Sequence, residues 1–200
     1  MSAIACLDLE GVLVPEIWIN VARRTGIDAL SATTRDIADY SELMRQRLDI
    51  CEKNGLGISD ISDVIAEMRP LQGATDFLAW LRENSQVVIL SDTFYEFAKP
   101  LMRQLGFPTL FCHRLEIAAG GRITGFELRI PDQKREAVRA LKNLNFRVVA
   151  AGDSYNDITM LGEADAGILF CPPAKVIDEF PQFPVTGDYS ELRAAFEEVL

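Results

Sequence analysis

The sequence is poor in histidine, in positive charge and in long apolar runs. Its single histidine, His113, excludes a metal site built from several histidines. Lys and Arg number 20 against 30 Asp and Glu, which gives a net charge of -10. Because nucleic acids and anionic membranes are bound through clustered Lys and Arg, we expect neither as a partner. No apolar run reaches the roughly 18 residues of a membrane span, and no secretory signal pattern opens the chain.

Cysteine is also sparse, and its spacing excludes a C-x-x-C redox or metal motif. Cys6, Cys51, Cys112 and Cys171 are far apart and lie mostly in apolar runs. This pattern is typical of buried, reduced thiols, so we expect a cytoplasmic protein. A chain of 200 residues is long enough for one domain, or for one domain with a smaller insert.

What the sequence does contain is a series of short apolar runs alternating with helical patterns. The runs that resemble buried strands are SAIACLDL, SQVVILSD, PTLFCHRLEI, FRVVAAGD and DAGILF. The helical patterns include TDFLAWLREN and DQKREAVRALKNLNF. This alternation predicts an α/β fold with a doubly wound, mostly parallel, Rossmann-like sheet. The Gly120-Gly121 pair in AAGGRITG predicts a hairpin at the edge of that sheet.

Residues 15–72 interrupt the alternation. They are rich in helix formers and contain no strand-like run, which predicts an inserted helical cap. Residues 1–14 and 73–200 would then form the α/β core. Near the end, CPPAKVIDEFPQFP predicts a surface connection that leads into a final helix near SELRAAFEEVL.

Polar side chains follow the predicted strands at the edge where open parallel sheets bind ligands. The set comprises Asp8, Glu10, Ser91, Thr93, Asp153 and Asp157, with Lys134 at the start of a helix. Carboxylates that converge on one crevice repel one another unless a hard cation neutralises them, and Mg²⁺ suits both carboxylate and phosphate oxygens. An ionised Asp can then attack phosphorus while Ser and Lys stabilise the developing charge. The set therefore indicates phosphoryl transfer through an aspartyl phosphate.

The order of these motifs resembles a known family. DLEGVL, SDT, the isolated Lys134 and GDSYND are similar to the four motifs of the haloacid dehalogenase superfamily. The helical insert, HRLEI and the hairpin more closely resemble phosphoserine phosphatases. Because its first motif carries Glu10, the chain most closely resembles the bifunctional branch described as phosphoserine phosphatase and homoserine phosphotransferase. The resemblance covers nearly the whole chain.

The resemblance implies a role for each motif residue. Asp8 is the expected nucleophile and Glu10 the general acid-base, with Ser91 and Lys134 completing the catalytic set. The expected Mg²⁺ ligands are Asp8, Glu10, Asp153 and Asp157. Most relatives carry Asp where this chain has Glu10, and the additional methylene changes the reach of the carboxyl group.

The resemblance also implies a substrate site for phosphoserine, and for homoserine as acceptor. Glu16 and Arg47 are expected to hold the α-amine and the α-carboxylate, since Arg binds carboxylates through two parallel hydrogen bonds. The remaining expected contacts are Ser91, Asp92, Lys134 and Asn156. Relatives usually place Gly at the position of Asp92. Its carboxylate either points away, leaving the backbone N–H in the site, or alters the choice of acceptor.

Simpler interpretations apply to single residues. A lone strand-end Asp, Lys134 or Arg47 is more often a solvated side chain, and Glu16 beside Pro15 also suits a helix N-terminus. His113 is expected to be structural, and Trp18 and Trp80 to be packing residues.

Other functions compatible with these motifs are a phosphatase for another small phosphorylated metabolite, a receiver-like signalling module and an inactive phosphoserine-binding protein. The oligomeric state stays open, with a homodimer as one option.

Overall fold

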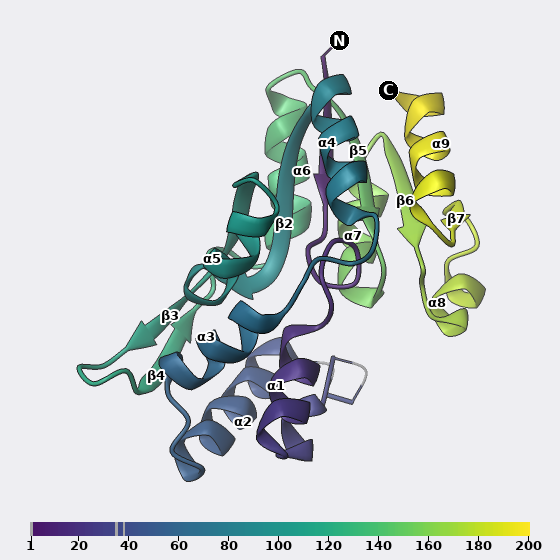
Figure 1. The fold of residues 1–200 in the computed structure, drawn as a ribbon. Helices are drawn as coiled ribbons and strands as arrows, with labels where there is room; N and C mark the ends of the chain where they lie inside the picture. The colour runs from purple at the N-terminus through teal and green to yellow at the C-terminus, as the bar shows by residue number, and fades with distance from the viewer. Residues whose placement is uncertain (1, 35, 38) are drawn as a thin grey trace.

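The computed structural model describes residues 2–34, 36–37 and 39–200, which form a central sheet flanked by helices (Figure 1). The strands are β1 (Ala3–Leu7), β2 (Gln86–Phe94), β3 (Thr109–Ile117), β4 (Ile123–Glu127), β5 (Arg147–Gly152), β6 (Ala166–Phe170) and β7 (Val185–Thr186). The helices are α1 (Ile17–Thr25), α2 (Tyr40–Lys53), α3 (Ile58–Glu67), α4 (Ala74–Asn84), α5 (Tyr95–Gln104), α6 (Gln133–Asn143), α7 (Ile158–Glu163), α8 (Ala174–Glu179) and α9 (Tyr189–Val199). Two short 3₁₀ segments are η1 (Asp28–Ser31) and η2 (Tyr155–Asp157).

The sheet confirms the predicted fold class. Its strand order is β4-β3-β2-β1-β5-β6-β7, and each pair is parallel except β3 and β4. The five predicted strands correspond to β1, β2, β3, β5 and β6. Gly120 and Gly121 lie in the turn between antiparallel β3 and β4, with β4 at the sheet edge, so the hairpin prediction is also confirmed.

Both faces of the sheet are buried because successive side chains of a strand point to opposite sides. Along β1, Ala5 and Leu7 belong to an apolar cluster that includes residues of α4, α5 and α9. Ile4 and Cys6 belong to a second cluster with residues of α6, α7 and α8. A strand buried in this way reads in sequence as a continuous apolar run.

Helices α1, α2 and α3 lie together beneath the carboxyl ends of the strands (Figure 1). The described residues of 15–72 form no strand, as the pattern predicts. Trp18, Met44 and Ile65 of these helices join the same buried cluster as Leu7 of β1. At the hairpin, the Ile58 backbone N–H donates to the Gly121 carbonyl at 2.9 Å. The helices therefore close over the end of the sheet from which the predicted motif residues emerge, and their assignment as a separate cap stays a prediction.

Residues 171–184 lie mostly at the surface and lead into the final helix α9, as predicted, but they also contain an unpredicted helix. This segment contains α8, whose Val176 is buried in the second apolar cluster. A helix this short offers few periodic positions, so the Pro-rich flanks dominated its pattern. Cys6, Cys51 and Cys112 are buried and Cys171 is exposed, and all four are free thiols. Among the described residues, no helix has the length and apolarity that a membrane span requires.

Candidate active site

The register of the sheet places the first motif between the other two strand-end motifs. Leu7 of β1 pairs with Ile89 of β2 on one side and with Ala151 of β5 on the other. Asp8, which follows β1, therefore lies near Ser91 in the last part of β2 and near Asp153, which follows β5. The Asp8 backbone N–H donates to the Ala151 carbonyl at 2.9 Å, which fixes the start of the loop.

Gly11 permits the close approach of this loop to the third motif. Its φ is +80°, and a Cβ atom there would lie 2.5 Å from Cγ of Asp153. Any side chain would be strained in this conformation and would collide with the Asp153 carboxylate. This requirement explains why glycine follows the two acidic residues of the first motif.

Lys134 holds Asp8 in place. Its ammonium lies 2.9 Å from Oδ1 of Asp8 and 2.7 Å from Oδ1 of Asp157, and all three side chains are buried. Oδ1 of Asp8 also accepts the Leu9 backbone N–H at 2.7 Å. Both of these contacts are made to one oxygen of the Asp8 carboxylate, Oδ1.

Asp157 is bound on both of its oxygens. Its Oδ2 accepts the backbone N–H groups of Asp153 at 2.9 Å and Ser154 at 3.1 Å, while Oδ1 faces Lys134. Asp157 thus shapes the loop after β5 and orients Lys134 at the same time.

Three of the predicted metal ligands converge. Asp8, Asp153 and Asp157 each offer one carboxylate oxygen, and these oxygens lie within 4.8 Å of one another. Burial, together with the neighbouring Asp157, raises the pKa of Asp153 to about 7. Burial and the same neighbour also raise the pKa of Asp8 well above its usual range, against the lowering effect of Lys134. One ammonium does not compensate this much buried negative charge, and the all-oxygen donor set fits a hard divalent cation such as Mg²⁺.

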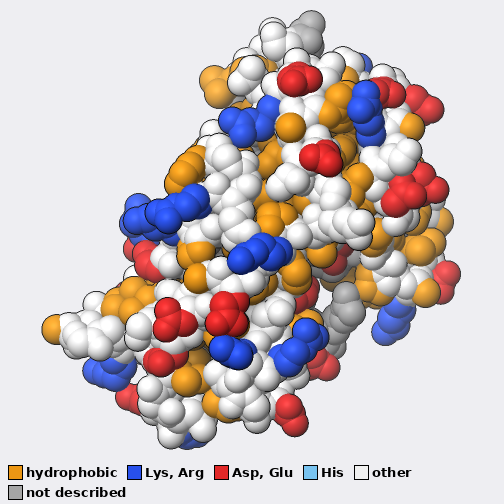
Figure 2. Space-filling view, viewed as in Figure 1, with side chains coloured by type: hydrophobic (Ala, Val, Ile, Leu, Met, Phe, Trp, Pro, Cys, Tyr) orange, Lys and Arg blue, Asp and Glu red, His pale blue; other side chains and the backbone are white. Residues whose placement is uncertain are grey.

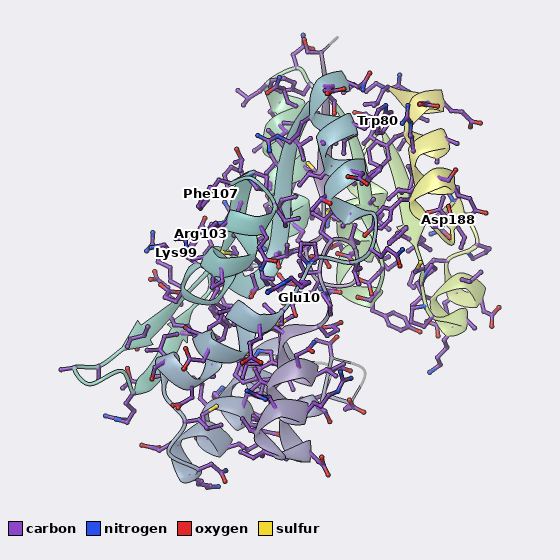
Figure 3. The ribbon with its side chains drawn as sticks, in the orientation of Figure 1. Glu10, Trp80, Lys99, Arg103, Phe107 and Asp188 are labelled. Atoms are coloured by element: carbon purple, nitrogen blue, oxygen red, sulfur yellow. The ribbon has the colours of Figure 1, made fainter. Side chains whose placement is uncertain are left out.

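Glu10, the fourth predicted ligand, lies outside this acidic group. Its Oε2 accepts the backbone N–H of Ile17 at 2.8 Å, at the start of α1. Figure 3 places Glu10 between the end of the sheet and the helices α1–α3. Burial, and secondarily the nearby Glu16, raises the pKa of Glu10 to about 8. A carboxyl group with this pKa is protonated near neutral pH and can donate a proton.

Arg47 and Glu16 lie at the helical end of the same pocket. The Arg47 guanidinium is 4.9 Å from the centre of the Trp18 ring, and its Nη2 donates to the Ala32 carbonyl at 2.7 Å. Its Nε is buried and has no hydrogen-bond partner among the described residues. Glu16 precedes α1 without capping it through its side chain. Arg47 and Glu16 therefore bring one positive and one negative group to the lining of the pocket.

Ser91 and Asp92 line the same pocket. Ser91 is almost fully buried, and its hydroxyl accepts the Thr93 backbone N–H at 3.2 Å. Oδ2 of Asp92 accepts a hydrogen bond of 2.9 Å from the Asn156 carboxamide. The Asp92 carboxylate thus lines the pocket instead of pointing away from it.

One pocket brings together most of the predicted site residues, namely Asp8, Glu10, Glu16, Arg47, Ser91, Asp92, Asp153 and Asn156. Lys134 and Asp157 are buried behind Asp8. Residues that line this pocket but were not predicted to do so include Trp18, Tyr40 and Thr34. Trp18, predicted as a packing residue, does pack edge-on against Phe97, but it also supports the Arg47 guanidinium. No sequence pattern marks these residues, because each reaches the pocket through the docking of the helices.

Comparison with known proteins gives consistent matches. A family model described as haloacid dehalogenase-like hydrolase matches residues 14–162. A Pseudomonas aeruginosa protein named phosphoserine phosphatase ThrH is 64% identical over 193 residues, covering 96% of this chain and 94% of that protein. A Pseudomonas syringae pv. tomato protein named phosphoserine phosphatase is 62% identical over 193 residues. The match covers 96% of this chain and 81% of that protein.

A solved structure described as a phospho-aspartyl intermediate analogue of phosphoserine phosphatase matches with a TM-score of 0.81. The match covers 100% of this chain and 99% of that structure's chain. At 20% sequence identity, it supports the fold.

Proposed function

The chain belongs to the haloacid dehalogenase-like hydrolases, and on that premise we propose that it is a Mg²⁺-dependent phosphoserine phosphatase that also transfers the phosphoryl group to homoserine. The observation that carries the proposal is the pocket itself. It is lined by the Asp8 carboxylate, which Lys134 orients, and by the Arg47 guanidinium, whose buried Nε has no hydrogen-bond partner among the described residues. The name of the 64% identical relative supports the same substrate.

In the first step, Asp8 attacks the phosphorus atom of phosphoserine. A bond forms between an Asp8 oxygen and phosphorus, and the bond between phosphorus and the serine oxygen breaks. Glu10, protonated at the start, transfers its proton to the departing oxygen, which leaves as the serine hydroxyl. Ser91 and Lys134 donate hydrogen bonds to the phosphoryl oxygens.

In the second step, Glu10 acts as a base. Now ionised, it removes a proton from water or from an alcohol, whose oxygen attacks phosphorus and releases Asp8. Lys134 keeps its contacts with Asp8 and Asp157 throughout, so the nucleophile returns to its starting position.

The cation would be held by Asp8 and Asp153, with Asp157 in support. When bound, Mg²⁺ neutralises charge on the phosphoryl oxygens and on the carboxylates. We expect activity to disappear in excess chelator and to return on addition of Mg²⁺. Ca²⁺ should substitute poorly, because its larger coordination shell disturbs the alignment of the attacking oxygen.

Asp153→Asn should lower kcat/KM by about 100-fold or more, because it removes a charged metal ligand. The matched control is Asp63→Asn, which makes the same substitution at an exposed position on α3 and should leave kcat/KM unchanged. Full activity of the wild type in chelator would show that no cation is required, and full activity of Asp153→Asn in Mg²⁺ would show that Asp153 is not a required ligand.

The helical end of the pocket is assigned to the amino-acid part of the substrate. Arg47 offers a planar cation to the α-carboxylate, and Glu16 offers an anion to the α-ammonium. The Trp18 ring beneath the guanidinium limits its movement. This pairing selects a zwitterion over a simple phosphate ester.

The same end of the pocket supports homoserine as an acceptor. After serine leaves, a second amino acid can occupy the place between Glu16 and Arg47 and present its hydroxyl to Glu10. Its local concentration then offsets the abundance of water. Homoserine has one methylene more than serine, and we expect the reach of Glu10 to suit this longer acceptor.

The transferase activity is tested by product partitioning. With labelled phosphoserine and increasing homoserine, we expect label to shift from inorganic phosphate to phosphohomoserine. Glycine, which has the same charged groups but no hydroxyl, is the control and should yield no new phosphorylated product. If saturating homoserine gives only inorganic phosphate, the protein is a phosphatase alone.

We also propose a cytoplasmic location, which is supported by four free thiols, three of them buried. On the face shown in Figure 2, Lys and Arg side chains are interspersed with Asp and Glu, which supports a small-molecule substrate over a polyanionic partner.

A further inference from the structure

His113, the single histidine, is buried on β3 behind the pocket, with 3% of its surface exposed. Its Nδ1 accepts the Arg129 backbone N–H at 3.1 Å. This hydrogen bond assigns the proton of a neutral ring to Nε2. Nε2 lies 3.6 Å from Oδ1 of Asp92, so a proton on Nε2 places partial positive charge beside this carboxylate.

Asp92 connects His113 to three further donors. Its Oδ2 accepts the Asn156 carboxamide at 2.9 Å and lies 3.7 Å from the Lys134 ammonium. Its Oδ1 accepts the Gln133 carboxamide at 3.3 Å. Burial disfavours the charge, but Lys134 and the contacts from His113 and Asn156 outweigh it and hold the pKa of Asp92 below its usual range. The anion thus draws together groups from β3, α6 and η2.

The contacts of Asp92 extend to two residues that line the pocket, Ser91 and Asn156. Gln133 donates to the Ser91 carbonyl at 2.6 Å and to the Asp92 carboxylate, which fixes these two residues in the last part of β2. Asn156 is held by Asp92 through its NH₂ group, while its carbonyl oxygen accepts the Ser154 hydroxyl at 2.6 Å. The orientation of the Asn156 carboxamide therefore depends on the position of the Asp92 carboxylate.

The helical insert also contacts His113 and Asp92, through Tyr40. The Tyr40 ring at the start of α2 lies 5.9 Å from the His113 ring, and its hydroxyl donates to the backbone carbonyl of Asp92. His113 is thus packed between the insert and Asp92. It is not among the described residues that line the pocket containing Asp8, and it lines a neighbouring pocket with Asp92 and Asn156.

We propose that His113 is a positioning residue that acts through Asp92 to hold the Asn156 carboxamide and the end of β2 in the geometry that the reaction needs. The effect on turnover rests on the proposed function, whereas the effect on Asn156 does not. The competing interpretation is that His113 only fills space and satisfies the Arg129 N–H group.

Two substitutions separate these interpretations because glutamine and asparagine each reproduce a different ring nitrogen. In His113→Gln the amide nitrogen lies near the position of Nε2 and can still donate to Asp92. In His113→Asn the amide oxygen lies near the position of Nδ1 and can still accept from Arg129, but the donor to Asp92 is lost. We expect kcat/KM to stay within about threefold of wild type in His113→Gln and to fall about tenfold or more in His113→Asn.

A background lacking the carboxylate tests whether the effect passes through Asp92. In the Asp92→Gly background, His113→Asn should cause no further loss of kcat/KM, because the Asp92 carboxylate that His113 positions is already absent. Thermal unfolding of every variant reports any general loss of stability. A His113→Asn protein that fails to fold leaves His113→Gln as the test, since a tenfold loss there contradicts the proposal.

A readout independent of activity is the pair of side-chain amide NMR signals of Asn156, assigned by their absence in Asn156→Ala. We expect them to shift in His113→Asn and to stay close to wild type in His113→Gln. Equal effects of the two substitutions, or an additive effect of His113→Asn in Asp92→Gly, would overturn the proposal. Activity on an aryl phosphate without activity on phosphoserine would instead refute the proposed substrate and leave this comparison intact.

Discussion

Asp8→Asn is expected to abolish turnover, with a loss of kcat on the order of 10⁵-fold or more. Asparagine keeps an oxygen at the position of Oδ1, where Asp8 accepts from Leu9 and Lys134. It lacks the second anionic oxygen, and an amide does not attack phosphorus at a useful rate. The loss should therefore be the same for phosphoserine and for an aryl phosphate, and steady-state assays on both substrates measure it.

The folded state should tolerate this change. Asp8 is one of three buried carboxylates that lie close to one another, and Lys134 pairs with two of them, so removing one negative charge reduces their mutual repulsion. We expect the free energy of unfolding of the metal-free protein to be unchanged or higher in Asp8→Asn. A folded Asp8→Asn protein with wild-type turnover would rule out Asp8 as the nucleophile.

Arg47→Met is expected to lower kcat/KM for phosphoserine by about 30-fold or more while changing hydrolysis of an aryl phosphate by less than about threefold. Loss of a desolvated charged contact costs roughly 2 to 5 kcal/mol, and the aryl substrate has no carboxylate to lose. Methionine retains the length and the apolar surface that packs against Trp18. The two specificity constants, measured on the same preparation, give the ratio directly.

The matched control is Arg45→Met, two residues earlier on α2, where the guanidinium is exposed and pairs with Glu42. This change should leave both substrates unaffected. Equal losses on both substrates in Arg47→Met would assign Arg47 to the phosphoryl end of the pocket or to folding, and the zwitterion clamp would be wrong.

The core of the fold was predictable because its signals are local. Strands such as β1 are buried on both faces and read as unbroken apolar runs, and two adjacent glycines mark the turn between β3 and β4. The two-residue β7 and the short helices α7 and α8 were not predicted, because elements this short carry too few residues to show a period.

The site was predictable only where the sheet itself places the residues. Asp8 and Asp153 each follow a strand and Ser91 lies in the last part of β2, so the parallel register brings them together. Tyr40 and Asp92 are separated by 52 residues and meet only because α2 docks over the end of β2. The contact of His113 with Asp92 likewise depends on how β3 lies against β2, which no local pattern reports.

The measurement that tests the central claim most directly is the capture of the phosphoenzyme. Wild-type protein is mixed with phosphoserine and Mg²⁺, quenched in acid within the first turnover, and digested for mass spectrometry with and without hydroxylamine. We predict one phosphoryl group on the peptide that contains Asp8, stable in acid, released by hydroxylamine and absent from Asp8→Asn. A turning-over enzyme that yields no such adduct, or one in which the phosphoryl group is found on Ser91, would contradict the account.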